Sequence, residues 1–542
     1  SSKDLEEVLD FTGVFQNIPG VKNVQFAREI DSDHKIENAA VENYVATISI
    51  LGNTSIRRVK YRNIPLWWLT SISEKHDRNH WGQVVFYFIE FFKTRKEFFN
   101  SQNVIVNLPR NYGGLKEFIE DNLSKLSTEI SFTYVDSETI HLGTLNMVKS
   151  FFKAAFQYFH YKLKASVLRM EKGGDNTDCN FFMTNNFEAV LNNNSSFDIG
   201  WYKDSMETSK NLPIPNLTSL NQLEKLDQTF NFFQNASPSL LTYLKESLKW
   251  LSLVFSLRKK LSAYNAESIF FNKTLLMGEF RRLLFDLNIP LRYYWLNQLA
   301  EQTTNSRFVY SDEMYSSGRL LSSSLVSKTN QRIGVQHGVI TINHTVYRYY
   351  PNDVLEGNAL PLPDKIILWN DTFRKILVDT CPQLNYRLLS CDDLKHKIII
   401  KNVNKIKKNL LKNQKRKILW TTTLLVHFYA EFEIVKGIFG NSSYDIWIRL
   451  HPNGDISESL VANIVGSNQF FMSKNTFEED IADTDLLICN AFSTVFYDGI
   501  MLGIPVFRIE HFGTYCNFSS DTENIFDVNN RNSFDEIMKK FG

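Results

Sequence analysis

Short apolar runs alternate with helical patterns through the second half of the chain, and this alternation restricts the fold more than any other feature of the sequence. The runs typical of strands lie at 307–310, 333–335, 366–369, 418–420, 444–450, 470–472, 485–489 and 506–508. Helical patterns separate them, as at 318–327 and 428–439. Strands that alternate with helices form parallel βαβ units. The sequence therefore predicts an α/β fold with Rossmann-like units.

A weaker, basic stretch divides the strands into two sets. Between 371 and 417 the alternation fades, and lysines and one arginine gather at 401–417. We expect an N-terminal domain over 1–375, a linker over 376–415 and a C-terminal domain over 416–542. The basic stretch is interpreted as a solvated helix face and linker, with contact to an anionic membrane as the alternative.

The first half of the chain is less regular. Runs at 45–51 and 104–108 are rich in β-branched residues and predict strands. Apolar residues at three- and four-residue spacing predict helices at 144–169, 240–261 and 268–287. The polar segment 185–221 is expected to be a surface loop, with a lid over the acceptor as the alternative. These helices are expected to be insertions in the N-terminal domain.

Charge and cysteine content exclude several classes of protein. The 542 residues carry 60 Lys and Arg against 59 Asp and Glu, so no overall field favours nucleic acid as a partner. The five cysteines are scattered, which fits a reducing, cytoplasmic compartment rather than a disulfide framework. No apolar run reaches the roughly 18 to 20 residues of a membrane span.

Ser493 and Thr494 mark the first candidate binding segment. They follow the apolar run 486–489 and begin a helical pattern, so their hydroxyls and the free backbone N–H groups there would lie at the carboxyl edge of the sheet. Such a place can bind phosphate. The alternative is a helix cap without a ligand.

Two further patterns lie in the same half. Asp498 stands five residues before Gly503 and seven before Pro505, and a carboxylate can accept two hydroxyl hydrogen bonds from a cis-diol. Arg449 and His451 end the strand at 444–450, where a proline follows and disfavours helical geometry at His451.

A third segment ends an earlier strand. Gln336, His337 and Gly338 follow the run 333–335, and the glycine permits a sharp turn or the close approach of a ligand. The alternative is a structural histidine at a strand end.

The order of these segments resembles that of GT-B glycosyltransferases of bacterial surface-polysaccharide biosynthesis. The likeness extends from about 307 to 511 and includes transferases of Kdo, sialic acid and other nonulosonic acids, as well as teichoic-acid polymerases. It implies two Rossmann-like domains facing across a cleft. It also implies a set of donor-binding residues: His451, Ser493, Thr494, Asp498, Arg449, Gln336 and Gly338. The family more often has Glu where this chain has the shorter Asp498.

The resemblance also suggests where the reaction takes place. Asp312 and Glu313 end a strand, and Gly318 and Arg319 follow in an acid-then-Gly-Arg pattern similar to that before Gln-His-Gly in such enzymes. Glycosyl transfer needs a base for the acceptor hydroxyl or a carboxylate nucleophile. We expect Glu313 in this role, with Asp312 as its rival and helix capping as the alternative for both. His337 is expected to protonate the departing phosphate or hold the substrate carboxylate.

Other enzyme classes lack sequence support. No strand-linked GxGxxG or GxxxxGK[ST] occurs, which argues against dinucleotide oxidoreductases and P-loop NTPases. Asp483 and Asp485 have DxD spacing but precede their strand, so they are interpreted as a helix-end turn. We therefore expect transfer without a metal or other cofactor, with a nucleotide sugar as substrate.

The expected function is transfer of a CMP-activated acidic sugar (Kdo, sialic acid or another nonulosonic acid) onto a bacterial surface glycan, either capsule or lipopolysaccharide. The alternatives are a CDP-glycerol or CDP-ribitol phosphotransferase, a transferase using a neutral UDP- or GDP-sugar, and a noncatalytic nucleotide- or glycan-binding assembly partner. The expected acceptor is an oligosaccharide or a lipid-linked glycan. The expected location is the cytoplasm, with peripheral contact at the inner face of the cytoplasmic membrane as a variant of it.

Overall fold

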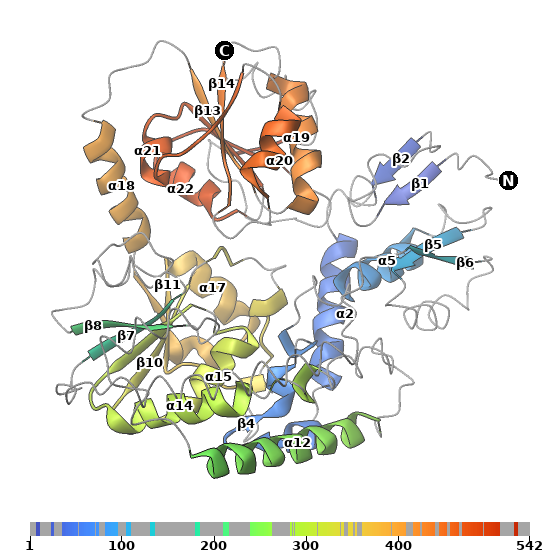
Figure 1. Ribbon diagram of the computed structural model, residues 1–542. Coiled ribbons are helices and arrows are strands. Elements are labelled where there is room, and N and C mark those ends of the chain that lie inside the picture. The colour runs from blue at the N-terminus through green and yellow to red at the C-terminus, as the bar shows by residue number, and fades with distance from the viewer. Residues whose placement is uncertain are drawn as a thin grey trace. The chain divides into compact units, whose positions relative to one another are not determined.

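A computed structural model gives the fold of the chain (Figure 1). It describes residues 7–10, 23–26, 35–51, 54–70, 72–74, 82–95, 104–109, 130–135, 179–184, 210–215, 239–262, 282–284, 286, 288–311, 313–336, 338–340, 345–350, 353–354, 360–391, 393–407, 416–422, 425–439, 444–451, 456–465, 469–490, 493–509 and 525–528. The predicted helix at 144–169 and most of that at 268–287 lie outside these residues.

The chain divides into two compact units. The C-terminal unit comprises Ser1–Lys35, Gly338–Asn343 and Asp393–Gly542, and the central unit comprises Ile36–His337 and His344–Asp392. The main division thus falls at Asp392/Asp393, inside the range 376–415 that the sequence marked as a linker.

In its described part, the C-terminal unit contains a six-stranded parallel sheet in the order β15-β14-β13-β16-β17-β18. Its strands are β13 (Lys417–Thr421), β14 (Asp445–Arg449), β15 (Phe470–Met472), β16 (Leu486–Asn490), β17 (Val506–Ile509) and β18 (Ile525–Val528). Its helices are α18 (Leu394–Lys407), α19 (Leu425–Phe439), α20 (Glu458–Val465), α21 (Phe477–Ala482) and α22 (Val495–Met501). A separate parallel pair, β1 (Glu7–Asp10) and β2 (Asn23–Phe26), belongs to the same unit.

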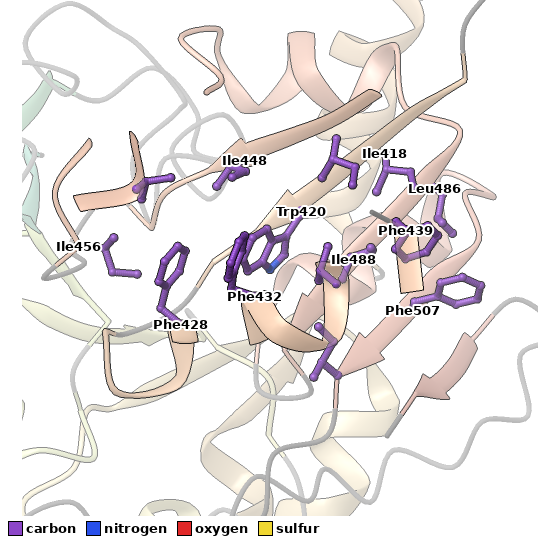
Figure 2. Close-up of a cluster of buried hydrophobic side chains, with 14 residues drawn as sticks. Ile418, Trp420, Phe428, Phe432, Phe439, Ile448, Ile456, Leu486, Ile488 and Phe507 are labelled. Atoms are coloured by element: carbon purple, nitrogen blue, oxygen red, sulfur yellow. The ribbon is translucent and has the colours of Figure 1, made fainter. Parts of the chain in front are cut away.

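Aromatic and aliphatic side chains together fill the core of this sheet (Figure 2). Trp420 of β13 stacks on Phe428 of α19, with ring centroids 5.5 Å apart and planes 6° from parallel. Phe432, one turn further along α19, lies 6.4 Å from Trp420 by ring centroid. All five residues of β13 and of β16 are buried, as expected for central strands of a parallel sheet covered on both faces.

The described part of the central unit holds a second six-stranded parallel sheet, in the order β12-β11-β10-β9-β7-β8. Its strands are β7 (Cys179–Thr184), β8 (Lys210–Pro215), β9 (Arg307–Tyr310), β10 (Gln331–Val335), β11 (Lys365–Leu368) and β12 (Leu388–Ser390). The accompanying helices are α14 (Asn288–Gln302), α15 (Ser316–Ser324), α17 (Asp371–Thr380) and the 3-10 segments η5 (Thr345–Tyr347) and η6 (Pro382–Arg387). Phe181 of β7 stacks on Phe308 of β9 at 5.0 Å between centroids.

Helical insertions surround this sheet in sequence, as expected. They are α2 (Lys35–Leu51), α3 (Thr54–Arg57), η1 (Leu66–Leu69), η2 (Ile72–Glu74), α5 (Gly82–Thr94) and α12 (Leu240–Ser262). Two small pairs accompany them: the hairpin of β3 (Lys60–Tyr61) and β4 (Ile64–Pro65), and the parallel pair of β5 (Val104–Pro109) and β6 (Ile130–Val135). The prediction of an α/β chain with two Rossmann-like parallel sheets is confirmed.

Two local predictions are wrong. The β-branched run 45–51 belongs to α2, because Val41, Val45 and Ile48 fall on one buried helical face. The polar segment 185–221 contains β8, which tolerates two prolines because it is an edge strand. Within the range 376–415, the structure describes η6, β12 and α18.

Candidate functional site

The strand order of the C-terminal sheet reverses between β13 and β16. The chain runs outward from β13 to β14 and β15, then crosses to β16 and continues to β17 and β18. In open parallel sheets, ligands bind outside the carboxyl ends of the strands at this switch point. Thr421 and Asn490 are the last residues of the two strands.

Ser493 and Thr494 lie beside this switch point, directly after β16. The Ser493 amide donates to the Asn490 carbonyl at 2.9 Å, and its hydroxyl accepts a long 3.4 Å bond from the Val495 amide. The Thr494 side chain makes no capping hydrogen bond to α22. Both residues are half-buried, so their hydroxyls remain candidates for ligand contact.

Gly338 belongs to the C-terminal unit and meets the same segment. A Cβ built on Gly338 would lie 4.0 Å from Cγ2 of Thr494. The structure therefore brings together two residues, 156 positions apart in the numbering, that the sequence assigned to donor binding.

A buried glutamate that the sequence did not suggest fixes the end of β16. Glu431 of α19 is fully buried and accepts from Nδ2 of Asn490 at 3.1 Å and from Nε1 of Trp420 at 3.3 Å. Its carboxylate thus ties α19 to both strands of the switch point. The only signal for it in the sequence was weak: an acid on the apolar side of a predicted helix.

Asp498 faces helix α18 rather than open solvent. It is 4% exposed, and its Oδ1 lies 3.4 Å from Nζ of Lys395 and 3.4 Å from Nε2 of His396. Burial raises the pKa of the Asp498 carboxyl, and Lys395 partly offsets this rise. Burial, with a smaller effect from Lys395, lowers the pKa of His396 to about 3, so the imidazole is neutral and Lys395 is the ionic partner. The ribose contact of Asp498 stays a prediction.

The glycine in the acid-x4-Gly-x-Pro pattern has a local structural role. Gly503 has φ +67°, in the left-handed region that favours glycine, and follows the C-cap Leu502 of α22. The Ile504 amide donates to the Gly499 carbonyl at 3.0 Å, which closes the helix end. This part of the pattern ends a helix and needs no ligand to explain it.

Arg449 is held within the protein. Its Nη1 donates to Oδ2 of Asp480 at 3.0 Å and to the Asn475 carbonyl at 2.8 Å, and its guanidinium lies 5.8 Å from the ring centroid of Phe477. Asp480 is fully buried on α21. These contacts join the end of β14 to α21, whereas His451 two residues later is exposed.

The sheet of the central unit has its own switch point, between β7 and β9. The chain moves from β7 outward to β8, then crosses to β9 and continues to β10, β11 and β12. Glu313 follows β9, and Gln336 follows β10. The other two predicted residues here, Asp312 and His337, lie outside the described residues.

Glu313 is buried, at 1% exposure, against β10. A Cβ on Gly334 would lie 3.4 Å from its Cγ and Cδ and 3.0 Å from Cγ of Pro363, so the glycine makes room for this side chain. Burial first, and the nearby Glu313 carboxyl next, raise the pKa of the Tyr349 hydroxyl. That hydroxyl therefore stays protonated and able to donate.

Gln336 is fully buried and bonded to the neighbouring strand end. Its Oε1 accepts from the Trp369 amide at 2.9 Å, and its carbonyl accepts from Nε1 of Trp369 at 2.9 Å. These contacts extend the pairing of β10 with β11 beyond Val335. The residue has a clear structural role, and its donor contact stays a prediction.

Arg319 of the acid-then-Gly-Arg pattern is buried in the scaffold. Its Nη1 donates to Oγ of Ser73 at 2.7 Å and to the Trp68 carbonyl at 3.1 Å, and its Nη2 donates to the Ser73 carbonyl at 3.2 Å. Glu74 completes the contact by accepting from the Ser316 amide at 2.7 Å, at the start of α15. The pattern therefore fixes α15 to η1 and η2 just after Glu313.

The sequence matches no protein family description and no curated protein. Among solved structures, two of the wall teichoic acid polymerase TagF with CDPG are similar. The first is 16% identical, with a TM-score of 0.30, 46% of this chain covered and 64% of that chain. The second is 11% identical, with a TM-score of 0.34 and coverage of 73% and 88%.

Two further solved structures are similar to this chain. UDP-N-acetylglucosamine 2-epimerase from Rickettsia bellii is 10% identical, with a TM-score of 0.36 and coverage of 68% of this chain and 88% of that chain. The catalytic domain of starch synthase IV from Arabidopsis thaliana, bound to ADP and acarbose, is 8% identical, with a TM-score of 0.27 and coverage of 51% and 71%. TM-scores this low carry no information on substrate.

Proposed function

We propose that the chain is a glycosyltransferase that moves a sugar from a nucleotide donor to a glycan acceptor. One observation supports this most: in each sheet, a predicted site segment follows a strand of the topological switch point. Ser493 and Thr494 follow β16, and Glu313 follows β9. Two separate sequence patterns thus end at the edge where parallel sheets bind ligands.

The proposed reaction breaks the bond between the anomeric carbon and the donor phosphate oxygen and forms one to an acceptor hydroxyl oxygen. In one route the acceptor proton goes to a carboxylate base as the acceptor oxygen displaces the donor phosphate. In the other route the carboxylate displaces the phosphate and forms a glycosyl-enzyme, and the acceptor oxygen then displaces the carboxylate and passes its proton to the departed phosphate. Glu313 is the proposed carboxylate, with Asp312 as its rival. His337 is proposed to protonate the leaving phosphate, and Ser493, Thr494 and His451 to bind it.

The proposed donor is a CMP-activated acidic sugar, because the three sequence segments together resemble the transferases of such sugars most. A CDP-glycerol or CDP-ribitol donor is the second candidate, since that resemblance shares the segment containing His451. A neutral UDP- or GDP-sugar is the third.

Calorimetric titration with CMP, CDP, UDP and GDP, with magnesium or with a chelator, tests these donors. Preference for CMP in the presence of chelator is expected. Preference for CDP would favour the phosphotransferase, and preference for UDP or GDP would favour a neutral sugar. If no nucleotide binds, the donor site is wrong and a noncatalytic role replaces the transferase.

Substitution of Glu313→Gln tests catalysis. The assay uses the donor whose nucleotide binds in the titration. We expect the rate of nucleotide release from this donor to fall about 10²- to 10⁴-fold, because the base or nucleophile is removed. Glu433→Gln, at an exposed position of α19, is the control and should keep the rate. A Glu313→Gln variant that melts like the parent yet keeps its turnover would contradict the assignment and favour Asp312 or a binding protein.

We also propose peripheral contact with an anionic membrane, which a lipid-linked acceptor would require. No helix in the part of the chain that the structure describes is long and apolar enough to cross a membrane. Helix α12, however, exposes large apolar side chains: Leu241 at 77%, Leu244 at 49%, Leu248 at 67% and Phe255 at 51%. Exposed basic residues accompany them: Lys245, Lys249, Arg258 and Lys259.

The exposed charges of α12 favour an anionic partner for its apolar face. The acid of α12, Glu246, is buried, so the exposed charges of the helix are all positive. An apolar stripe flanked by Lys and Arg is typical of helices that lie in the interface of anionic bilayers.

A further inference from the structure

A cavity of about 320 Å³ opens in the central unit between the β3–β4 turn and helix α14. Its lining comes from the turn residues 61–63 and from one side of α14, at 293–301. Its size is at the lower end of the roughly 300–1,000 Å³ range of small-molecule sites. No residue predicted for donor binding or catalysis lines it.

The cavity is separate from the carboxyl edge of the sheet. Asn330, which precedes β10, donates from Nδ2 to the carbonyl of Ala300 at 2.9 Å and to that of Thr303 at 3.0 Å. The C-terminal end of α14 therefore lies at the amino ends of the strands. Glu313 follows the carboxyl end of β9, at the opposite edge of the same sheet.

Aromatic rings form one part of the lining. Tyr61 and Tyr293 pack edge to face with ring centroids 5.5 Å apart, and Tyr294 next to them is half-buried. Tyr61 is also fixed from behind, since its ring meets Trp250 at 5.5 Å and its hydroxyl donates to Oε2 of Glu246 at 2.8 Å. Tyr61 and Tyr293 are themselves almost fully buried, so they hold the floor of the cavity, and the half-buried Tyr294 supplies the ring surface that a ligand can pack on.

Amide side chains form the other part, and their orientation is fixed. Nδ2 of Asn297 donates to Oε1 of Glu301 at 2.6 Å, and Nε2 of Gln298 donates to Oε2 of the same carboxylate at 2.8 Å. Each amide then has a carbonyl oxygen that can accept from a hydroxyl group. Asn63 in the turn adds an exposed amide.

The cation of the lining is already paired. Arg62 lies 2.6 Å from Oε1 of Glu246, which disfavours a phosphate or carboxylate ligand.

From these contacts we infer that the cavity binds one neutral sugar unit. The C–H face of a pyranose ring would pack on the Tyr294 ring, and its hydroxyls would donate to the amide carbonyls of Asn297 and Gln298. A nucleotide or an acidic sugar would instead need an unpaired cation. That the bound unit belongs to a glycan acceptor, held away from its reacting end, rests on the proposed function; neutral-sugar binding itself does not.

Saturation-transfer NMR and calorimetry with methyl β-glucoside, methyl β-galactoside and N-acetylglucosamine test the inference on the full chain. At least one of these probes should bind. Tyr294→Ala should weaken that binding by about tenfold or more, the scale of losing one stacked ring. Tyr294→Phe, which keeps the ring, should change it by less than about threefold.

Controls separate this site from the donor site and from misfolding. Tyr386→Ala removes a tyrosine that is 68% exposed in the same unit and should leave sugar affinity unchanged. Glucuronate should bind more weakly than glucoside; equal or tighter binding would overturn the choice of a neutral sugar. Failure of all neutral probes, or equal loss in the Tyr386 control, would overturn the site.

Nucleotide titration gives the independent readout. Tyr294→Ala should leave CMP affinity unchanged and should melt like the parent. If sugar binds and no nucleotide does, the proposed function fails while this site stands. If CMP binds and no sugar does, this site fails alone. Loss of both affinities in a folded Tyr294→Ala variant would overturn the separation of the two sites.

Discussion

At the scale of single residues, several side chains in the candidate site segments stabilise the fold through buried contacts. Arg319 is the clearest case: it is 1% exposed, and its guanidinium lies 5.5 Å from the ring centroid of Trp68. The guanidinium of Arg57 lies 4.6 Å from the same centroid. Arg57 in turn pairs with the buried Asp353 at 2.7 Å. Breaking such a buried polar network leaves groups without partners, so it costs more than losing a surface ion pair.

Substitution of Arg319→Met should therefore destabilise the protein by about 3 kcal/mol or more, because it removes three hydrogen bonds and leaves carbonyl and hydroxyl groups of Trp68 and Ser73 buried without a donor. Urea unfolding measures the effect. Arg374→Met on α17, where the arginine side chain is 38% exposed, is the control and should cost less than about 1 kcal/mol. Similar losses for both variants would contradict the structural role of Arg319.

The neutral His396 predicts a pH dependence of stability. Its pKa is about 3 in the folded protein and about 6.5 when unfolded, so below pH 6.5 the unfolded state alone takes up the proton. This group's contribution to stability should therefore fall as pH drops from 6.5 toward 3, by up to about 1.4 kcal/mol per pH unit. Asp498 acts in the opposite direction, since its pKa is raised on folding.

A His396→Leu variant isolates this effect. It should be less stable at pH 7.5, where the imidazole packs 4.5 Å from the Tyr497 ring, but should lose less stability between pH 6.5 and 5 than the parent. Unfolding midpoints at the three pH values measure both changes. Parallel pH profiles would mean that His396 is protonated in the fold.

At the scale of elements, helix α22 connects the candidate phosphate segment to the sheet. Gly499 is the residue that lets it lie close: a Cβ there would come within 2.6 Å of Val506 Cγ2 and 2.7 Å of Leu487 Cδ2. Neighbours at that distance must move, and both belong to strands of the core. The closeness of α22 to β16 and β17 therefore depends on one glycine.

We expect Gly499→Ala to cost about 1–3 kcal/mol of stability through overpacking and to weaken CMP binding, because α22 and the preceding Ser493–Thr494 segment must shift. Gly437→Ala on α19 is a matched control, since a Cβ there meets nothing within 4 Å. It should stabilise by about 0.5–1 kcal/mol. Thermal unfolding and CMP titration of both variants test this; a neutral Gly499→Ala would show that α22 has room to spare.

At the scale of the whole molecule, each unit carries a parallel sheet with its own switch point, and α12 adds a basic, apolar face to the central unit. The two features concern different partners. The switch points predict the binding of small molecules, whereas α12 predicts contact with the membrane at which the acceptor would be bound. They can therefore be tested by separate variants.

The protein should co-sediment with phosphatidylcholine vesicles that contain phosphatidylglycerol and not with phosphatidylcholine alone. Lys245→Gln with Lys249→Gln should weaken binding roughly 30-fold, at about 1 kcal/mol per basic residue near the surface. Leu244→Glu with Leu248→Glu should abolish it. Leu389→Glu, at a leucine 44% exposed in β12, is the control and should bind like the parent. Equal binding to both vesicle types would contradict the proposed anionic partner.

Sequence periodicity predicted the central strands well and the irregular elements poorly. The runs at 307–310, 418–420 and 470–472 lie within strands of the structure, because the strands of these parallel sheets are short, apolar and flanked by turns. The run 45–51 became part of a helix, because its β-branched residues also satisfy helical spacing and packing decided between the two. The apolar pattern of strand β18 is too weak to predict a strand, and helix α18 is too basic for a clear apolar face to be recognised.

The sequence predicted which segments form the candidate site but not which residues contact one another there. The positions of Ser493, Thr494 and Glu313 at strand ends followed from the alternation of strands and helices. The side-chain contacts around these segments did not follow from that alternation: Arg449 binds Asp480, Gln336 binds Trp369 and Glu431 binds Asn490. Each pair joins residues far apart in sequence, and no local pattern specifies such a partner.

The sequence by itself determined the fold class and the strand ends where ligands can bind, since both follow from local periodicity and the short reach of turns. Only the tertiary structure decided the strand order that creates the two switch points, the burial of Asp498 against α18, and the aromatic cavity beside α14. These depend on which surfaces pack together. That choice is made by the burial of the whole apolar surface at once, which residue spacing along the chain does not encode.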